Sequence, residues 1–259
     1  MDTPEEEVSP ALRAAQDEVR ELQRELALAR QRMEDFTHSV SHDLRAPLRH
    51  VSAYLKIIRE DLPQPVAPAI LAHLQTAGDA AAQMGRQIDG LLELSRVGRA
   101  DMQWADVDLQ RLVAEVQDKL APEIGERQID WQVAPDLPRL HGDITLLGRL
   151  VWCLLSNALK FTQATPAACI RIGWQPARPG WCELQIEDNG AGFDPRFADR
   201  LFKVFQRLHS ARQFDGLGVG LALARLIAER HGGTVRAQGA VDAGCRVSLV
   251  LPMAAGAPA

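Results

Sequence analysis

The chain has 259 residues and a formal net charge of −5 at pH 7, with 46% hydrophobic and 24% charged residues. This length predicts two domains of about 150 residues, the composition excludes a wholly disordered chain, and the weakly acidic charge gives no support for bulk nucleic-acid binding. The four cysteines form no C-x-x-C pair, so we expect buried thiols rather than a disulfide or zinc framework. No stretch approaches the ~18 apolar residues of a membrane span and the acidic N-terminus is unlike a signal peptide, so we expect a soluble, cytoplasmic protein.

Residues 1–35 are predicted to form a frayed acidic tail and then a coiled-coil signalling helix. From Leu12 onward, apolar residues recur at alternating steps of three and four. This 3.5-residue period is typical of a coiled coil, most simply a parallel dimer. The alternative is a lone amphipathic helix that packs on its own domain. The apolar residues of this pattern are Leu12, Ala15, Val19, Leu22, Leu26, Ala29, Met33, Phe36 and Val40.

The phase of this pattern slips at Val40, because Phe36, Val40 and Leu44 are separated by two successive steps of four. Such a stutter locally unwinds a supercoil. Pro47 follows one turn later and is expected to bend the helix or to remove one of its hydrogen bonds. We hypothesise that a signal in the coil acts at this point by changing the exposure of His42.

Residues 36–95 are predicted to form a helical hairpin. Three prolines break the helical pattern within residues 61–69, and a second helical pattern follows from Leu74 to Leu91. Two such hairpins from two chains make a four-helix bundle, so we expect a homodimer. Residues 96–107 contain two glycines and mixed charge and are interpreted as a linker.

Residues 108–253 are predicted to form a second domain of mixed helices and short strands, followed by a disordered tail over 254–259. Helical patterns cover 109–120, 143–161 and 219–231. The fold class is therefore α+β. The expected strands are Ile129–Val133, Cys169–Trp174, Trp181–Ile186, Thr234–Ala237 and Arg246–Leu251.

His42, with Asp43 directly after it, is a candidate nucleophile. On a helix, an exposed imidazole whose neighbouring carboxylate accepts a proton from one ring nitrogen has a more nucleophilic second nitrogen. Two alternatives stay open from this segment alone. His42 is an ordinary surface histidine, or His38 and His42, four residues apart, hold a metal ion, although no third ligand is evident.

Two glycine-rich segments and one helical pair are candidate nucleotide-binding elements. Asp188 follows a predicted strand, where its carboxylate is placed to accept the exocyclic amine of adenine, while Gly190 and Gly192 let the backbone approach the base. Asn157 and Lys160 share one helical face and combine an oxygen ligand for Mg²⁺ with a cation for phosphate. Gly216, Gly218 and Gly220 precede a predicted helix, where they offer bare amides to phosphate. The alternative for this glycine motif is an ordinary mobile turn. The alternative for the Asn157–Lys160 pair is a buried asparagine beside a lysine that reaches solvent.

Together these motifs resemble those of two-component sensor histidine kinases. Residues 36–95 resemble the dimerisation and phosphoacceptor domain, with His42 in its H box. Residues 108–253 resemble the catalytic ATP-binding domain of the gyrase, heat-shock chaperone, histidine kinase and MutL (GHKL) superfamily, with Asn157 and Lys160 in the N box. Arg207 matches an arginine that contacts the γ-phosphate in such kinases. The run 201–209 is similar to kinases of the phytochrome type, and it contains Phe202 to Phe205, which resemble the F box.

The resemblance implies an α/β sandwich in which ATP binds beneath a mobile lid over residues 193–217. It implies that His42 is phosphorylated from Mg-ATP, with Asn157 as the Mg²⁺ ligand, and that the phosphoryl group passes to an aspartate of a response regulator receiver domain. An upstream sensor domain or sensor protein is implied as a further partner. The rival interpretations are a dimeric scaffold or phosphotransfer module with a degenerate ATP site, and a chaperone-like or gyrase-like ATPase.

Three residues depart from the family pattern. Cys153 stands where relatives have the first asparagine of the N box, so we expect reduced nucleotide affinity or rate. Ala46 stands where relatives carry threonine or asparagine four residues after the phosphoacceptor, so we expect weak or absent phosphatase activity. Cys245 stands near the adenine pocket where serine or threonine is frequent.

Overall fold

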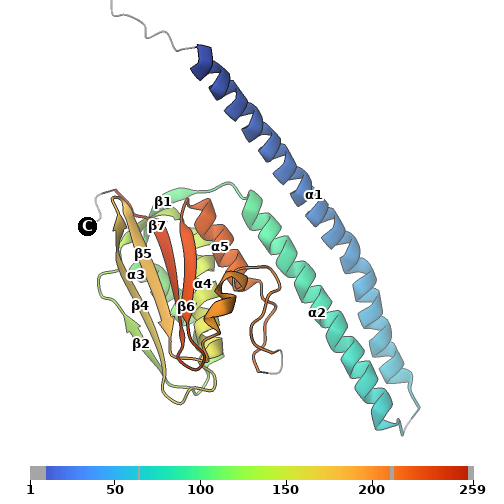
Figure 1. Cartoon of the computed structure of the whole chain (residues 1–259). Coiled ribbons are helices and arrows are strands. Elements are labelled where there is room, and N and C mark those ends of the chain that lie inside the picture. The colour runs from blue at the N-terminus through green and yellow to red at the C-terminus, as the bar shows by residue number, and fades with distance from the viewer. Residues whose placement is uncertain (1–9, 64, 211–212, 256–259) are drawn as a thin grey trace, which may run out of the picture. The chain divides into compact units, whose positions relative to one another are not determined.

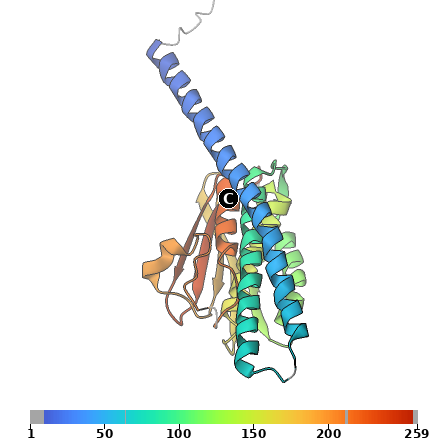
Figure 2. The ribbon, with the colours of Figure 1, turned by 90° about the vertical axis from the view of Figure 1, so that its right-hand side faces the viewer.

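The computed structural model describes residues 10–63, 65–210 and 213–255, and the chain divides into two compact units between Ala81 and Ala82. The first unit contains α1 (Pro10–Asp61) and the start of α2 (Pro68–Arg99). Figures 1 and 2 show the end of α1 beside the start of α2, running in the opposite direction. The predicted helical hairpin is therefore confirmed, although the compact units meet within α2 rather than at the expected boundary of residue 95.

α1 continues without interruption through the stutter and through Pro47. Proline has no amide hydrogen, so the carbonyl of Asp43 one turn earlier loses its helical partner, but the helix does not end there. Val19, Leu22 and Met33 of the predicted coiled-coil seam are exposed in the single chain, and they are the kind of side chain that a dimer would cover. The side chains of Leu12, Ala15, Leu26, Ala29 and Phe36 lie outside the described residues, so the coiled coil stays a prediction.

The second unit is built on a five-stranded sheet in the order β2-β4-β5-β7-β6. β2 runs parallel to β4, and the other neighbours are antiparallel. Alternate residues of β5, such as Leu184 and Ile186, are buried and face the helices, so the helices cover this face of the sheet (Figure 1). The strands are β2 (Ile129–Val133), β4 (Ala168–Arg178), β5 (Trp181–Asp188), β6 (Thr234–Gly239) and β7 (Cys245–Pro252).

Three helices contribute most of the remaining core. α3 (Leu109–Ile124), α4 (Ile144–Phe161) and α5 (Gly220–Arg230) bury apolar stripes that meet the sheet in one hydrophobic cluster. A short 3₁₀ helix, η1 (Pro195–Arg200), lies in the connection between β5 and α5. The α+β class and the helices and strands expected over 108–253 are thus confirmed, with β4, β5, β6 and β7 longer than predicted.

The linker expected over 96–107 is wrong. α2 continues to Arg99, and β1 (Trp104–Asp108) pairs antiparallel with β3 (Arg139–Asp143), a strand that the sequence pattern did not indicate. Five residues each with mixed polarity show no clear alternation, and their pairing partner lies about 35 residues away in the chain, which local patterning does not report.

The start of α4 is fixed by Asp143, whose carboxylate accepts hydrogen bonds from the amides of Thr145 (2.8 Å) and Leu146 (3.0 Å). Nε2 of the buried His231 in turn accepts from the Asp143 amide (3.1 Å), and its Nδ1 donates to the Ile227 carbonyl (2.8 Å). Burial lowers the pKa of His231 below its ordinary value of 6.5, so the ring is held neutral in this tautomer.

α4 also corrects one expectation about membrane spans. Its 18 residues have a mean hydropathy of 1.3, which by length and composition is enough to cross a membrane, although no such stretch was expected. Half of these 18 residues are buried inside the protein, as is usual for the central helix of a folded core.

Candidate functional site

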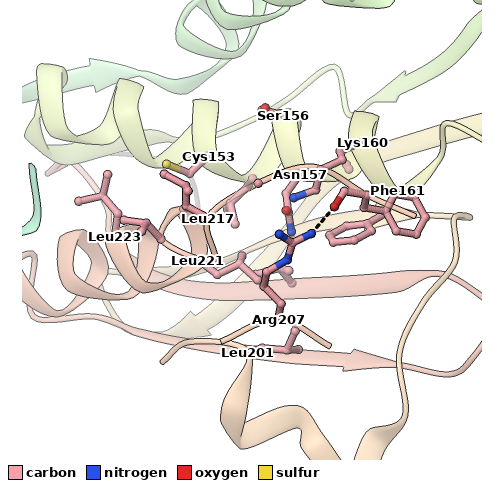
Figure 3. A pocket seen from close by; sticks show the side chains of 18 of the residues that line it. Cys153, Ser156, Asn157, Lys160, Phe161, Leu201, Arg207, Leu217, Leu221 and Leu223 are labelled. Carbon is pink, nitrogen blue, oxygen red and sulfur yellow. Dashed lines mark hydrogen bonds between the residues drawn. The ribbon is translucent and has the colours of Figure 1, made fainter. Parts of the chain in front are cut away.

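The second unit contains a cavity of about 560 Å³, lined by α4, the N-terminus of α5, β5, β7 and the connection between β5 and α5 (Figure 3). The C-terminal part of α2 contributes to the rim through Gly90 and Glu93. Of the predicted ATP-site residues, Gly190 does not line the cavity, whereas the others do: Asn157, Lys160, Asp188, Gly192, Arg207, Gly216, Gly218 and Gly220. The structure thus brings together residues from four separate segments of the chain.

Asp188 ends β5 and turns its carboxylate into this cavity. Burial raises the pKa of Asp188 to about 6, although hydrogen bonds from the Gly190 and Cys245 amides favour the charged form. The Gly190 amide donates to Oδ1 at 2.9 Å. A half-buried carboxylate with accepting capacity to spare suits a ligand that presents an N–H group, such as the amine of adenine.

The glycines of this region allow close approach of one backbone segment to another. A Cβ at Gly190 would lie 2.3 Å from the Phe161 carbonyl oxygen. Gly192 has φ of +58°, and a Cβ there would lie 1.8 Å from the Ala240 carbonyl oxygen. The sequence led us to expect that these glycines approach the ligand, but what the geometry demands of them is packing within the protein that fixes the cavity wall.

Two cations also line the cavity. Lys160 and Arg207 both line it, and Figure 3 shows their side chains together with Asn157. Burial lowers the pKa of Lys160, as does the positive charge of Arg207, while Asp215 opposes the shift. Arg207 donates to the Phe214 carbonyl. Two neighbouring cations that line one cavity are suited to binding an anion such as phosphate, although the Asp215 carboxylate also lines this cavity.

Asn157 is the candidate Mg²⁺ ligand. Among the side chains that the structure describes, no group of three histidine, cysteine or acidic residues is placed to hold a metal ion. The single carboxamide oxygen of Asn157 fits a hard cation that arrives with the phosphates of a nucleotide, because Mg²⁺ keeps most of its ligands from phosphate and water. The side chain of His38 lies outside the described residues, so the His38–His42 metal pair is not tested.

The two cysteines at the departures from the family pattern also line the cavity. Burial raises the pKa of Cys153 to about 11. Burial, aided by the nearby Asp188, raises the pKa of Cys245 to about 12. Both thiols are therefore protonated near neutral pH, and they form apolar wall rather than nucleophiles or metal ligands.

His42 lies on α1, in the first unit, with 76% of its side chain exposed. Its Nδ1 is 3.3 Å from Oδ1 of Asp43, which is equally open to solvent. A carboxylate accepts but does not donate, so this contact favours the tautomer with hydrogen on Nδ1. The lone pair of Nε2 is then free to attack an electrophile.

Sequence reasoning missed a group of rings in the cavity wall. His209 and Phe214, both in the connection between η1 and α5, pack against Phe161 at the end of α4. His209 was visible in the run Leu201–His209, but only the fold shows that it meets a ring about 50 residues earlier in the chain. A second missed contact joins α2 to α4 through the 2.6 Å ion pair of Glu93 with Arg149.

Comparisons with known proteins match two domain families, one after the other along the chain. Residues 32–100 match the His Kinase A (phospho-acceptor) domain, and residues 142–255 match the histidine kinase-, DNA gyrase B- and HSP90-like ATPase family.

Relatives that align with most of the chain agree with these matches. The chain is 31% identical to cyanobacterial phytochrome B of Nostoc sp. over 85% of its length and 29% of that protein's. It is 30% identical to the methanogenesis regulatory histidine kinase FilI of Methanothrix harundinacea over 92% of its length and 26% of that protein's. The fold resembles that of full-length ShkA in complex with AMPPNP, with a TM-score of 0.61 at 22% identity over 86% of this chain and 47% of the other. The chain therefore spans less than a third of the length of these two curated relatives.

Proposed function

The chain belongs to the two-component sensor histidine kinases, and we propose that it is an ATP-dependent protein-histidine kinase that phosphorylates its own His42. The observation that carries this proposal is the convergence of Asp188, Lys160 and Arg207 in one cavity of about 560 Å³, in a chain that also exposes His42 beside Asp43. The match to the ATPase family supports ATP as the ligand of this cavity.

In the proposed reaction, Nε2 of His42 attacks the γ-phosphorus in line with the bridging oxygen. The N–P bond forms as the P–O bond to the β-phosphate breaks, and ADP leaves with the electron pair. Positive charge develops on the ring during the attack, and Asp43 stabilises it by accepting the Nδ1 proton. Most of the acceleration is expected from positioning and charge neutralisation, since the transferred group has little covalent chemistry of its own.

Different residues of the cavity bind different parts of the nucleotide in this proposal. Asp188 accepts the adenine amine, and Lys160 and Arg207 hold the phosphates. Asn157 would hold Mg²⁺, which when bound neutralises charge on the phosphate oxygens. The amide of Gly218, just before α5, adds a donor for phosphate at the positive end of that helix. The amide of Gly216 already donates to the Asp215 carboxylate at 2.7 Å, so it reaches phosphate only if that bond opens.

The partners of the reaction follow from the family. We propose a homodimer joined through α1 and α2, an aspartate of a response regulator receiver domain as the final phosphoryl acceptor, and an upstream sensor that acts through the N-terminal helix. We also propose a cytoplasmic location, because the proposed phosphoryl donor is ATP. Ala46 leaves no hydroxyl or amide four residues after His42 to position a hydrolytic water, so we propose weak phosphatase activity toward the regulator.

Two rival functions are separated by following both products of one reaction. The purified chain is incubated with γ-labelled Mg-ATP, and label on protein and released ADP are counted together. Stoichiometric label on the protein supports the kinase. ADP release without phosphoprotein would support an ATPase of the chaperone or gyrase kind, and bound ATP with neither product would support the scaffold with a degenerate site.

A further inference from the structure

His209 is held by a hydrogen bond that fixes both its place and its tautomer. It lies in the connection between η1 and α5, it lines the cavity, and its Nε2 is 2.8 Å from the Gly192 carbonyl oxygen. A carbonyl oxygen only accepts, so Nε2 carries the hydrogen and donates it. This bond ties the connection to the segment that follows Asp188 on β5.

The ring of His209 belongs to a cluster of three. Its centroid is 5.2 Å from that of Phe161 and 5.1 Å from that of Phe214, and the two phenylalanine centroids are 4.9 Å apart. All three distances lie in the range of favourable edge or tilted aromatic contacts. Phe161 is the last residue of α4 and its carbonyl accepts from the Ala191 amide (3.1 Å), so the cluster is anchored on a fixed element.

The cluster reaches Arg207 through one atom. The carbonyl oxygen of Phe214 accepts a hydrogen bond from Nη2 of Arg207, one of the two cations proposed to hold the phosphates. A guanidinium has five N–H donors, so this bond fixes one edge of the group and leaves the others for an anion. Contacts therefore run without a break from Gly192 through His209 and Phe214 to Arg207.

We propose that His209 is a positioning residue that sets Arg207 for the terminal phosphate of the nucleotide. The inference rests on the proposed function and goes beyond it, because it assigns a role to a side chain that need not touch the nucleotide. Without the Nε2–H donor, the ring of His209 is no longer tied to the Gly192 carbonyl. Phe214 then loses the support of a fixed neighbour on one side, and its carbonyl no longer holds the guanidinium in one orientation. The contact that weakens is the one with the γ-phosphate. ATP has this group and ADP lacks it, so the affinity for ATP falls while the affinity for ADP does not.

The test compares equilibrium dissociation constants for Mg-ATP and Mg-ADP in the full chain. His209→Phe keeps a ring in the cluster but removes the donor. We expect it to weaken ATP binding about tenfold, equal to about 1.4 kcal/mol, and to change ADP binding less than twofold. His209→Gln, whose amide can still donate to the Gly192 carbonyl, is the matched control and should recover most of the ATP preference.

A double-mutant cycle with Arg207 distinguishes positioning from a general loss of structure. If His209 acts through Arg207, then His209→Phe combined with Arg207→Ala loses no more ATP preference than Arg207→Ala alone. Equal weakening of ATP and ADP, additive losses in the cycle, or wild-type affinities in His209→Phe would each overturn the inference.

Two further outcomes are covered by the same measurements. Should His209→Phe fail to fold, Phe214→Leu removes the ring contact while keeping the carbonyl, and an unchanged ratio of ATP to ADP affinity in that variant would overturn the inference. A wild-type chain that binds neither nucleotide would instead refute the proposed function. Wild-type binding with an unaltered His209→Phe refutes the positioning role alone.

Discussion

Nucleotide affinity should fall when the pH is lowered through the pKa of Asp188. The proposed adenine contact needs the ionised carboxylate, because the exocyclic amine donates and the carboxylate accepts. Burial raises the pKa of this group to about 6. At that value about 97% of the carboxylate is ionised at pH 7.5 and about 9% at pH 5, so the affinity is expected to drop about tenfold over this interval.

The assay is the dissociation constant of Mg-ADP measured in steps from pH 7.5 to pH 5, by calorimetry or with a fluorescent analogue. Phosphate groups also titrate near pH 6, so the phosphates contribute a slope of their own. Asp188→Asn supplies the control, because it keeps that slope and lacks the carboxylate. The Asp188→Asn variant should bind Mg-ADP weakly at every pH, and its dissociation constant should lack the change with pH that titration of Asp188 causes. Parallel curves for the two proteins would refute the reasoning.

Two predictions concern the stability of the second unit. Gly192→Ala should destabilise it in urea unfolding by more than the about 1–2 kcal/mol that a left-handed residue costs, because its Cβ would also lie 1.8 Å from the Ala240 carbonyl oxygen. Gly180→Ala shares the positive φ (+76°) but meets no described atom within 4 Å, so it should lose only the backbone part, and equal losses in both variants would contradict this account. The neutral His231 should stabilise the fold above pH 6.5, with the contribution lost as the pH falls below that value, since its folded pKa is lowered. The stability difference between wild type and His231→Gln should therefore shrink between pH 7.5 and pH 5.5, and a difference that grows would show that the sign is wrong.

The helices and strands that show a clear local hydrophobic periodicity could be predicted from the sequence. The hairpin helices, the three helices of the second unit and the five strands of its main sheet all have clear periodicity. β1 and β3 were missed because their stability comes from pairing with each other and from His231, which bonds to the Asp143 amide. Pro47 was expected to bend α1 or to remove one of its hydrogen bonds, and it does the second by its chemistry, while the helix of 52 residues continues through it.

The site was predictable in its polar residues and unpredictable in its supporting contacts. Asn157, Lys160, Asp188 and Arg207 stand in recognisable motifs, and the structure places them around one cavity. The contact of Gly192 with the Ala240 carbonyl joins segments about 50 residues apart in the chain, so no local motif could report it. The ring cluster around His209 escaped for the same reason.

The measurement that tests the central claim most directly is the location of the phosphoryl group after incubation with γ-labelled Mg-ATP. Wild type is compared with His42→Gln and with His50→Gln, which removes another exposed histidine of the same helix and is the matched control. The account predicts acid-labile, alkali-stable label on wild type and on His50→Gln, and none on His42→Gln. Full labelling of His42→Gln would place the acceptor elsewhere and contradict the account.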